Sequence, residues 1–253
     1  MGIATYQDLA GKTVFVTGGG SGIGGEFVRA FSAQGANVAF VSLPTDPGEQ
    51  LALEVEKNTG NKPLFLPCDL RDVAAIKDAV RQAREAFGPI GVLINNAARD
   101  DRHDVTSLDE EGWDNSMAIN LRPHYFTVQA CADDMKATGG SIINMGSNSV
   151  NLGLVGYPAY VAAKAAIVGL TKALARELGE HDIRVNALIP GWVMTERQKQ
   201  LWATPEAVEA CLKEQSLKRT ISKADIANAA LFLASDASSM MSGQSMIVDG
   251  GRV

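Results

Sequence analysis

The segment TVFVTGGGSGIG, residues 13–24, joins a short β-branched run to a glycine-rich turn and the start of an amphipathic stretch. Glycine at positions Gly18, Gly22 and Gly24 lets the backbone turn tightly and approach a pyrophosphate closely. A helix that begins at such a turn presents N–H donors and its positive dipole end to phosphate. The spacing Gly-x3-Gly-x-Gly differs from GxGxxG, and no GK[ST] ending of a P-loop follows. A turn of this kind after the first strand of a βαβ unit predicts dinucleotide binding rather than nucleoside-triphosphate hydrolysis.

Short β-branched runs alternate with amphipathic stretches along the rest of the chain. Several of the runs are apolar on both faces, as expected for parallel strands covered by helices on each side. The alternation predicts an α/β fold with one Rossmann-type, doubly wound, parallel seven-stranded sheet. No linker or charge block divides the chain, so a single domain is expected over residues 1–253. The predicted strands are 13–17, 37–42, 64–66, 92–95, 141–145, 184–189 and 245–248, and the predicted helices are 22–34, 46–58, 73–87, 109–137, 159–178 and 223–235.

Composition excludes several classes of protein. Of the 253 residues, 46% are hydrophobic and 21% are charged, enough for a core that needs no metal or disulfide. A net charge of −6 without a basic cluster argues against a nucleic-acid partner. The N-terminus has no apolar signal segment, and no apolar run reaches the ~18 residues of a membrane span. Three unpaired cysteines fit a reducing compartment, and three scattered histidines match no metal-ligand spacing. We therefore expect a soluble cytoplasmic protein without a metal site.

The segment YVAAK places Tyr160 and Lys164 four residues apart near the start of a predicted helix. On a helix these two side chains are neighbours. Taken alone, such a pair is common on solvated surfaces. Ser147, however, lies thirteen residues earlier, just past the fifth predicted strand. That strand end faces the same crevice as the glycine-rich turn, so the three residues form a candidate hydroxyl–phenol–amine site.

With these motifs in order, the chain resembles a short-chain dehydrogenase/reductase from residue 12 to residue 251. One departure is Ala98, where that family usually has glycine; its methyl group is expected to shift the backbone near the cofactor slightly without abolishing binding. The motifs that carry the resemblance are TGGGSGIG at 17–24, Asp69 in CDL, NNAA at 95–98, Asn120, Ser147, YVAAK at 160–164, and Pro190-Gly191.

The resemblance implies a role for each catalytic candidate. Tyr160 is expected to act as general base in alcohol oxidation, and its phenol, with an ordinary pKa near 10, needs positive charge nearby to ionise. Lys164 and the oxidised nicotinamide ring can supply that charge, and Lys164 is also expected to hold the nicotinamide ribose. Ser147 is expected to hydrogen-bond the substrate oxygen. Asn120 is expected to fix a water that links Lys164 to solvent.

The same resemblance implies an NAD or NADP site. Asp69 is expected to accept from the adenine amino group, and residues 190–195 to cover the nicotinamide. The choice between the two cofactors stays open, because the second strand ends at Ser42 with neither an acid nor a base, and the nearest acid, Asp46, is four residues on. The candidate cofactor-binding residues are Gly18, Ser21, Gly22, Ile23, Gly24, Ser42, Asp69, Leu70, Asn96, Ala97, Ala98, Tyr160, Lys164, Pro190, Gly191, Val193 and Thr195.

Residues 191–220 insert thirty residues after the sixth predicted strand, with a helical pattern over 205–218. This position suits a substrate lid, although a structural excursion or a subunit contact would look the same. The loop 100–103 and, within the insertion, Arg197-Gln198 and residues 202–206 resemble the pocket and lid of bacterial xylose-type aldose 1-dehydrogenases. Each candidate substrate contact also has an interpretation without a substrate. Arg102 and His103 can belong to an exposed charged loop, and Asn148 and Asn151 to turns. Tyr157 can cap a helix, and Trp192 can pack under the lid. The candidate substrate-binding residues are Arg102, His103, Ser147, Asn148, Asn151, Tyr157, Tyr160 and Trp192.

The predicted function is therefore oxidation of the C1 hydroxyl of a sugar to a lactone, with hydride transfer to the nicotinamide cofactor. A reductase of a ketone or 3-oxoacyl thioester is the alternative within the family, kept open by basic residues around the lid. A dinucleotide sensor without turnover is the alternative outside it, but such proteins usually lack the tyrosine or the lysine. The family resemblance also implies a homotetramer built on the helices predicted at 109–137 and 159–178 and the last strand.

Overall fold

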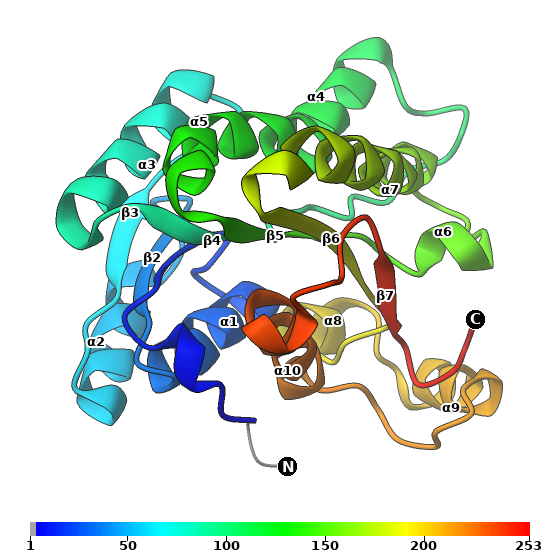
Figure 1. The fold of residues 1–253 in the computed structure, drawn as a ribbon. Helices are drawn as coiled ribbons and strands as arrows, with labels where there is room; N and C mark the ends of the chain where they lie inside the picture. The colour runs from blue at the N-terminus through cyan, green and yellow to red at the C-terminus, as the bar shows by residue number, and fades with distance from the viewer. Residues whose placement is uncertain (1–3) are drawn as a thin grey trace.

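A seven-stranded parallel sheet forms the centre of the computed structural model, which describes residues 4–253 (Figure 1). The strand order is β3-β2-β1-β4-β5-β6-β7, and every neighbouring pair is parallel. The predicted fold class is confirmed, and the predicted strand ends differ from the observed ones by no more than one or two residues. The strands are β1 Thr13–Thr17, β2 Asn37–Ser42, β3 Leu64–Pro67, β4 Ile90–Asn95, β5 Gly140–Met145, β6 Ile183–Pro190 and β7 Ser245–Val248.

Helices cover both faces of the sheet, and the alternation of side chains along each strand explains why. In β1, Val14 and Val16 are buried against one set of helices, whereas Phe15 between them is buried against the other. Figure 1 shows α3, α5 and α7 above the sheet and α1 and α10 below it. Within residues 4–253, no helix is long and apolar enough to cross a membrane. The main covering helices are α1 Gly22–Ala33, α2 Gly48–Thr59, α3 Val73–Phe87, α5 Arg122–Thr138, α7 Pro158–Leu178 and α10 Lys223–Ala234.

The single helix predicted over residues 109–137 is wrong, because the structure has two helices there. Helix α4 spans Glu110–Asn120 and α5 begins at Arg122. Leu121 between them leaves helical geometry, with φ −125° and ψ −55°. Pro123 lies in the first turn of α5, where its missing N–H costs nothing, but inside a continuous helix its ring would clash with the preceding turn. The break leaves Asn120 as the last residue of α4.

Between β6 and α10 the chain forms two short helices, α8 Glu196–Leu201 and α9 Pro205–Glu214. Thr195 and Thr204 cap them by accepting hydrogen bonds from backbone N–H groups. The helix predicted over 205–218 ends early because the next residues bond to the C-terminal segment instead: the N–H of Leu217 donates to the carbonyl of Gly250. Neither α8 nor the four-residue helix α6, Ser149–Leu152, was predicted.

The glycine-rich turn after β1 packs against the first turn of α1. A β-carbon at Gly24 would lie 1.9 Å from the carbonyl oxygen of Gly18, so no larger residue fits without moving the backbone. Gly18 and Gly22 have φ values of +64° and +58°, in the left-handed region that glycine adopts most easily. The close approach sets the direction in which α1 leaves the sheet.

Gly24→Ala is therefore expected to destabilise the fold by about 1–3 kcal/mol, the usual cost of forcing a methyl group into a packed site. Gly25→Ala is the matched control, because a β-carbon at Gly25 makes only ordinary contacts, the nearest at 3.5 Å. Alanine there should be neutral or stabilising by up to ~1 kcal/mol through helix propensity. Urea unfolding measures both, and equal stability of the two variants would contradict the packing argument.

Candidate active site

A cavity of about 650 Å³ opens at the carboxyl ends of the strands. It lies beside the point between β1 and β4 where the strand order reverses, the usual ligand site of an open parallel sheet. The turn after β1 and the segments that follow β2 to β6 all contribute to its wall, together with Tyr160 near the start of α7. Parallel strands place these segments side by side although they are far apart in sequence.

Most of the predicted site residues line this cavity. All of the cofactor candidates do so except Lys164. Of the catalytic candidates, Ser147 and Tyr160 line it, whereas Asn120 and Lys164 are buried and do not. The substrate candidates that line it are Arg102, Ser147, Asn148, Tyr157, Tyr160 and Trp192.

His103 and Asn151 do not line the cavity. The backbone N–H of His103 donates to the carbonyl of Gly156 at 2.8 Å, and the His103 ring contacts the carbonyl of Asp104. Asn151 is on the exposed side of α6. Asn151 thus lies within a short helix rather than in a turn.

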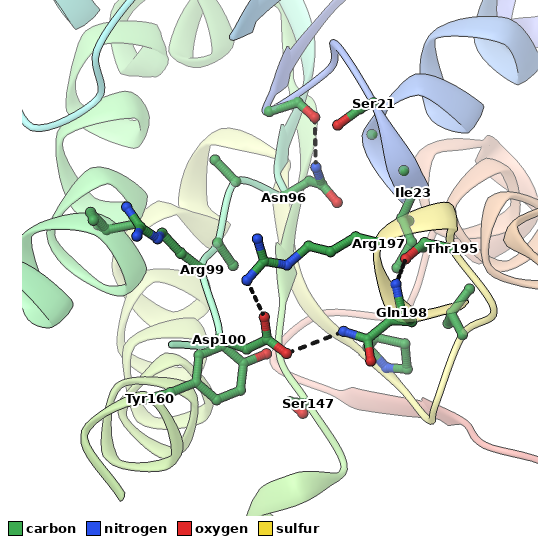
Figure 2. A pocket seen from close by; sticks show the side chains of 18 of the residues that line it. Ser21, Ile23, Asn96, Arg99, Asp100, Ser147, Tyr160, Thr195, Arg197 and Gln198 are labelled. Atoms are coloured by element: carbon green, nitrogen blue, oxygen red, sulfur yellow. Dashed lines mark hydrogen bonds and ion pairs between the residues drawn. The ribbon is translucent and has the colours of Figure 1, made fainter. Parts of the chain in front are cut away.

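Asn96 ties the two strands at the reversal point together. Its amide donates to the carbonyls of Thr17 and Gly18 at 3.0 and 3.2 Å, and its backbone N–H donates to the Thr17 hydroxyl at 2.9 Å (Figure 2). On the cavity side the turn is open, since a β-carbon at Gly22 would meet only Thr195, at 3.8 Å. The turn and the N-terminus of α1 thus present accessible backbone to the cavity, which fits a dinucleotide pyrophosphate.

Acidic side chains lie on the cavity wall beyond this turn. Asp46 turns back to the end of β2, where its carboxylate accepts a hydrogen bond from the Ser42 hydroxyl. Asp69 is paired with Arg71 at 2.6 Å, and the hydrogen bonds from that guanidinium lower the pKa of Asp69. The sequence analysis left the place of Asp46 open and missed Arg71, because neither position belongs to a motif.

Ser147, Tyr160 and Lys164 come together as their spacing predicts. The Ser147 and Ser149 hydroxyls are 2.8 Å apart, which holds Ser147 at the end of β5, and Ser147 and Tyr160 both line the cavity. The ammonium of Lys164 lies 5.6 Å from the centre of the Tyr160 ring. It donates to the carbonyl of Met145, the last residue of β5, at 2.8 Å.

Burial dominates the electrostatics of this group. It raises the pKa of the Tyr160 phenol, and the nearby Ser147 hydroxyl opposes that rise only in part. Burial also lowers the pKa of Lys164 to about 7, since the side chain is only 1% exposed. Both charged forms are thus disfavoured in the protein alone. Ionisation of Tyr160 near neutral pH therefore needs positive charge beyond that of Lys164.

Asn120 uses its amide to hold the loop that follows β4. Its oxygen accepts from the backbone N–H of Arg99 at 2.8 Å, and its nitrogen donates to the carbonyl of Arg99 at 3.1 Å. Because Asn120 ends α4, the break before α5 lets the side chain reach this loop. The contacts fix the backbone immediately before Asp100. A role for Asn120 in holding a water beside Lys164 stays a prediction.

The other half of the cavity is polar and aromatic. The guanidinium of Arg102 lies 3.7 Å from the centre of the Tyr157 ring, within stacking range. The indole of Trp192 donates to Gln198 on α8 at 2.8 Å. Gln198, in turn, donates to the Asp100 carboxylate (Figure 2). Asp100, Arg197 and Gln198 belong to the segments that resemble the pocket and lid, but they were not assigned as substrate contacts. Nothing in local spacing shows that residues 97 positions apart meet.

Comparison with known proteins identifies the family. Residues 18–252 match the family model described as enoyl-(acyl carrier protein) reductase, which belongs to the short-chain dehydrogenases/reductases. The chain belongs to the short-chain dehydrogenase/reductase family. It is thus an NAD(P)-dependent oxidoreductase that acts on CH–OH groups, as the sequence predicted.

Two curated relatives and one solved structure illustrate the likeness. The chain is 47% identical to a probable galactose dehydrogenase of Rhizobium meliloti (strain 1021), over 97% of this chain and 96% of the relative. It is 41% identical to a D-xylose 1-dehydrogenase of Caulobacter vibrioides, over 99% of each chain. The L-sorbose reductase of Gluconobacter frateurii, complexed with NADPH and L-sorbose, superposes with a TM-score of 0.91 at 25% identity, over 98% of each chain.

The position of Asp46 generates a prediction about the cofactor. A carboxylate beside Ser42 repels the 2′-phosphate of NADP and can accept from the 2′-hydroxyl of NAD. We expect Asp46→Asn to lower the preference for NAD over NADP, as the ratio of the two kcat/KM values, by about 10-fold, which corresponds to ~1.4 kcal/mol. Glu49→Gln is the control, since Glu49 is exposed on α2 and does not line the cavity. An unchanged ratio in Asp46→Asn would exclude this role.

Proposed function

We propose that this enzyme oxidises the C1 hydroxyl of an aldose to a lactone, with transfer of hydride to the nicotinamide cofactor. The observation that carries the proposal is the wall that faces Ser147 and Tyr160. It presents carboxylate, guanidinium, amide and indole groups from Asp100, Arg102, Gln198 and Trp192. A sugar needs such a wall, because each hydroxyl that leaves water must find a hydrogen-bond partner.

The names of the relatives support this substrate class. The galactose and xylose dehydrogenases match nearly the whole chain, at identities that a shared fold alone would not require. The indole of Trp192 at the cavity wall offers a flat apolar face to one side of a sugar ring. An acyl chain would gain nothing from this set of polar groups and would remove them from water without offering them a hydrogen bond.

In this mechanism Tyr160 removes the proton from the C1 hydroxyl while Ser147 donates to the same oxygen. The oxidised nicotinamide supplies the hydride acceptor and a positive charge. Lys164 stabilises the phenolate from behind the cavity wall, held there by the Met145 carbonyl. The residues that would hold the dinucleotide are the turn from Gly18 to Gly24, Asn96 and the segment 190–195.

We also propose that residues 191–220 act as the lid over the substrate. Trp192 and Gln198 lie on the cavity wall, and Thr195 caps α8 through the backbone N–H of Gln198. A closed lid excludes water from the hydride transfer. From the family resemblance we also propose a homotetramer, and from the composition and the N-terminal sequence a cytoplasmic location.

Reduction of a ketone or 3-oxoacyl thioester is the second candidate, because the matched family model carries a reductase name. That activity on a carrier-bound substrate predicts free positive charge around the lid. Four of the basic side chains named there are paired with carboxylates, however: Arg197 with Asp100, Lys199 with Glu196, Lys213 with Glu209 and Arg219 with Asp225. Lys218 donates to backbone carbonyls. The compensation favours the sugar substrate. A sensor without turnover is disfavoured because Tyr160 and Lys164 are both present.

A spectrophotometric screen tests the proposal. Pentoses, hexoses and deoxysugars are each offered with NAD and with NADP, and aldose oxidation should appear as cofactor reduction at about 340 nm. A product assay for the lactone completes the test. Turnover of an acetoacetyl thioester, with no activity on any aldose, would instead establish the reductase alternative.

Tyr160→Phe tests the mechanism. Loss of the phenol hydroxyl should lower kcat by at least 10²–10⁴-fold, the usual contribution of a general base, while the cofactor dissociation constant changes little. Tyr125→Phe is the matched control, because Tyr125 is exposed on α5 and away from the cavity wall. Full activity of Tyr160→Phe would refute the assignment of the base.

A further inference from the structure

The Asp100 carboxylate lies at the catalytic end of the cavity. Figure 2 shows it next to the hydroxyl end of Tyr160, and the two groups interact electrostatically, the charge of Asp100 opposing ionisation of the phenol. Its side chain is 19% exposed, although it belongs to a loop of exposed residues. The next residue, Asp101, is 52% exposed, pairs with Arg99 and does not line the cavity. Two adjacent carboxylates thus occupy different environments.

Three groups around Asp100 hold it in place. One carboxylate oxygen accepts from Arg197 at 3.3 Å, and the other accepts from the Gln198 amide at 3.2 Å. Arg102 lies 4.0 Å from that second oxygen, while its guanidinium stacks on Tyr157. The loop is fixed from the other side by Asn120, which holds the backbone of Arg99.

These contacts leave part of the acceptor capacity of Asp100 unused. A carboxylate has about four lone-pair sites, and the two hydrogen bonds from α8 occupy two of them. A sugar hydroxyl that donates to one of the remaining sites makes a charge-assisted bond, roughly twice as strong as a neutral one. A substrate that lacks the hydroxyl instead leaves a desolvated carboxylate without its partner.

We propose that Asp100 is a specificity-determining residue, whose carboxylate accepts a hydrogen bond from one sugar hydroxyl other than the reacting C1 hydroxyl, with Arg197 and Gln198 holding it in position. The inference rests on the proposed aldose oxidation and gives Asp100, which the sequence analysis placed in the pocket loop without a role, a defined contact with the substrate. The same contact links the lid to substrate binding. Helix α8 in the lid brings Arg197 and Gln198 to Asp100, so a change in the position of α8 changes the sugar contact.

A purely structural role is the competing explanation, since Asp100 also links the loop after β4 to α8. The two explanations differ in how the loss depends on the substrate. Loss of a purely structural contact lowers kcat/KM for every sugar by the same factor. Loss of a hydroxyl acceptor lowers kcat/KM for the sugars that carry the recognised hydroxyl, but not for the analogue that lacks it.

Asp100→Asn is the test variant, because it keeps the shape of the side chain but removes the charge. The substrates are the aldose that the wild type oxidises fastest and its monodeoxy analogues at each ring position other than C1. We expect Asp100→Asn to lower kcat/KM for the parent sugar by about 10- to 100-fold, the usual range for a hydrogen bond to a charged group. For one deoxy analogue, kcat/KM should change by less than about 3-fold, within the range that a neutral contact contributes.

Two further variants complete the design. Asp101→Asn is the matched control and should behave as wild type with every substrate. Arg197→Met removes the ion pair to α8 but leaves the carboxylate, so it should retain the wild-type discrimination between the parent sugar and that analogue. It also keeps the test decisive if Asp100→Asn folds poorly, which thermal unfolding and cofactor titration reveal.

The outcomes separate this inference from the proposed function. An equal loss of kcat/KM for the parent sugar and all analogues in Asp100→Asn would show that the cluster only holds the lid. Complete loss of discrimination in Arg197→Met, in which the carboxylate and Gln198 remain, would show that Arg197 rather than the carboxylate recognises the hydroxyl. In either case aldose oxidation by the wild type still stands. A wild type that oxidises no aldose refutes the proposed function and this inference with it.

Discussion

The contact between the Gly18 carbonyl and Gly24 determines how the rest of the site is built. Because no β-carbon fits there, α1 starts directly at the turn after β1, and its N-terminus faces the cavity. The amide of Asn96 then joins this turn to the end of β4. A phosphate-binding turn, the reversal of strand order and the loop that leads to Asp100 are therefore parts of one rigid arrangement.

The catalytic half of the cavity depends on a balance between burial and charge. Tyr160 and Lys164 are buried, and burial disfavours the phenolate form of the one and the ammonium form of the other. Asp100 adds a negative charge and Arg102 a positive one close to the phenol. The proton affinity of Tyr160 is thus set by what enters the cavity as well as by its neighbours in the chain. Such dependence suits a base that should act only when cofactor and substrate are both bound.

Much of the fold and of the cofactor site was predictable because local chemistry specifies it. Strands buried on both faces read as continuous apolar runs, and glycine spacing marks the phosphate turn. The substrate half was less predictable: His103 and Asn151 were assigned as substrate contacts and do not line the cavity, whereas Asp100 and Gln198 line it but were assigned no contact. The break at Leu121 was missed because apolar periodicity continues through it, and only the ring of Pro123 forbids a single helix.

The sequence by itself determined the class of sheet, the order of its elements, the family and the presence of a serine, a tyrosine and a lysine at one edge. These features depend on residues close in the chain or on a periodicity that a helix or strand imposes. The tertiary structure alone decided that Asp46 returns to Ser42 and that α8 meets Asp100 across 97 residues. Such contacts depend on where loops come to rest, which is set by packing between distant elements rather than by local spacing.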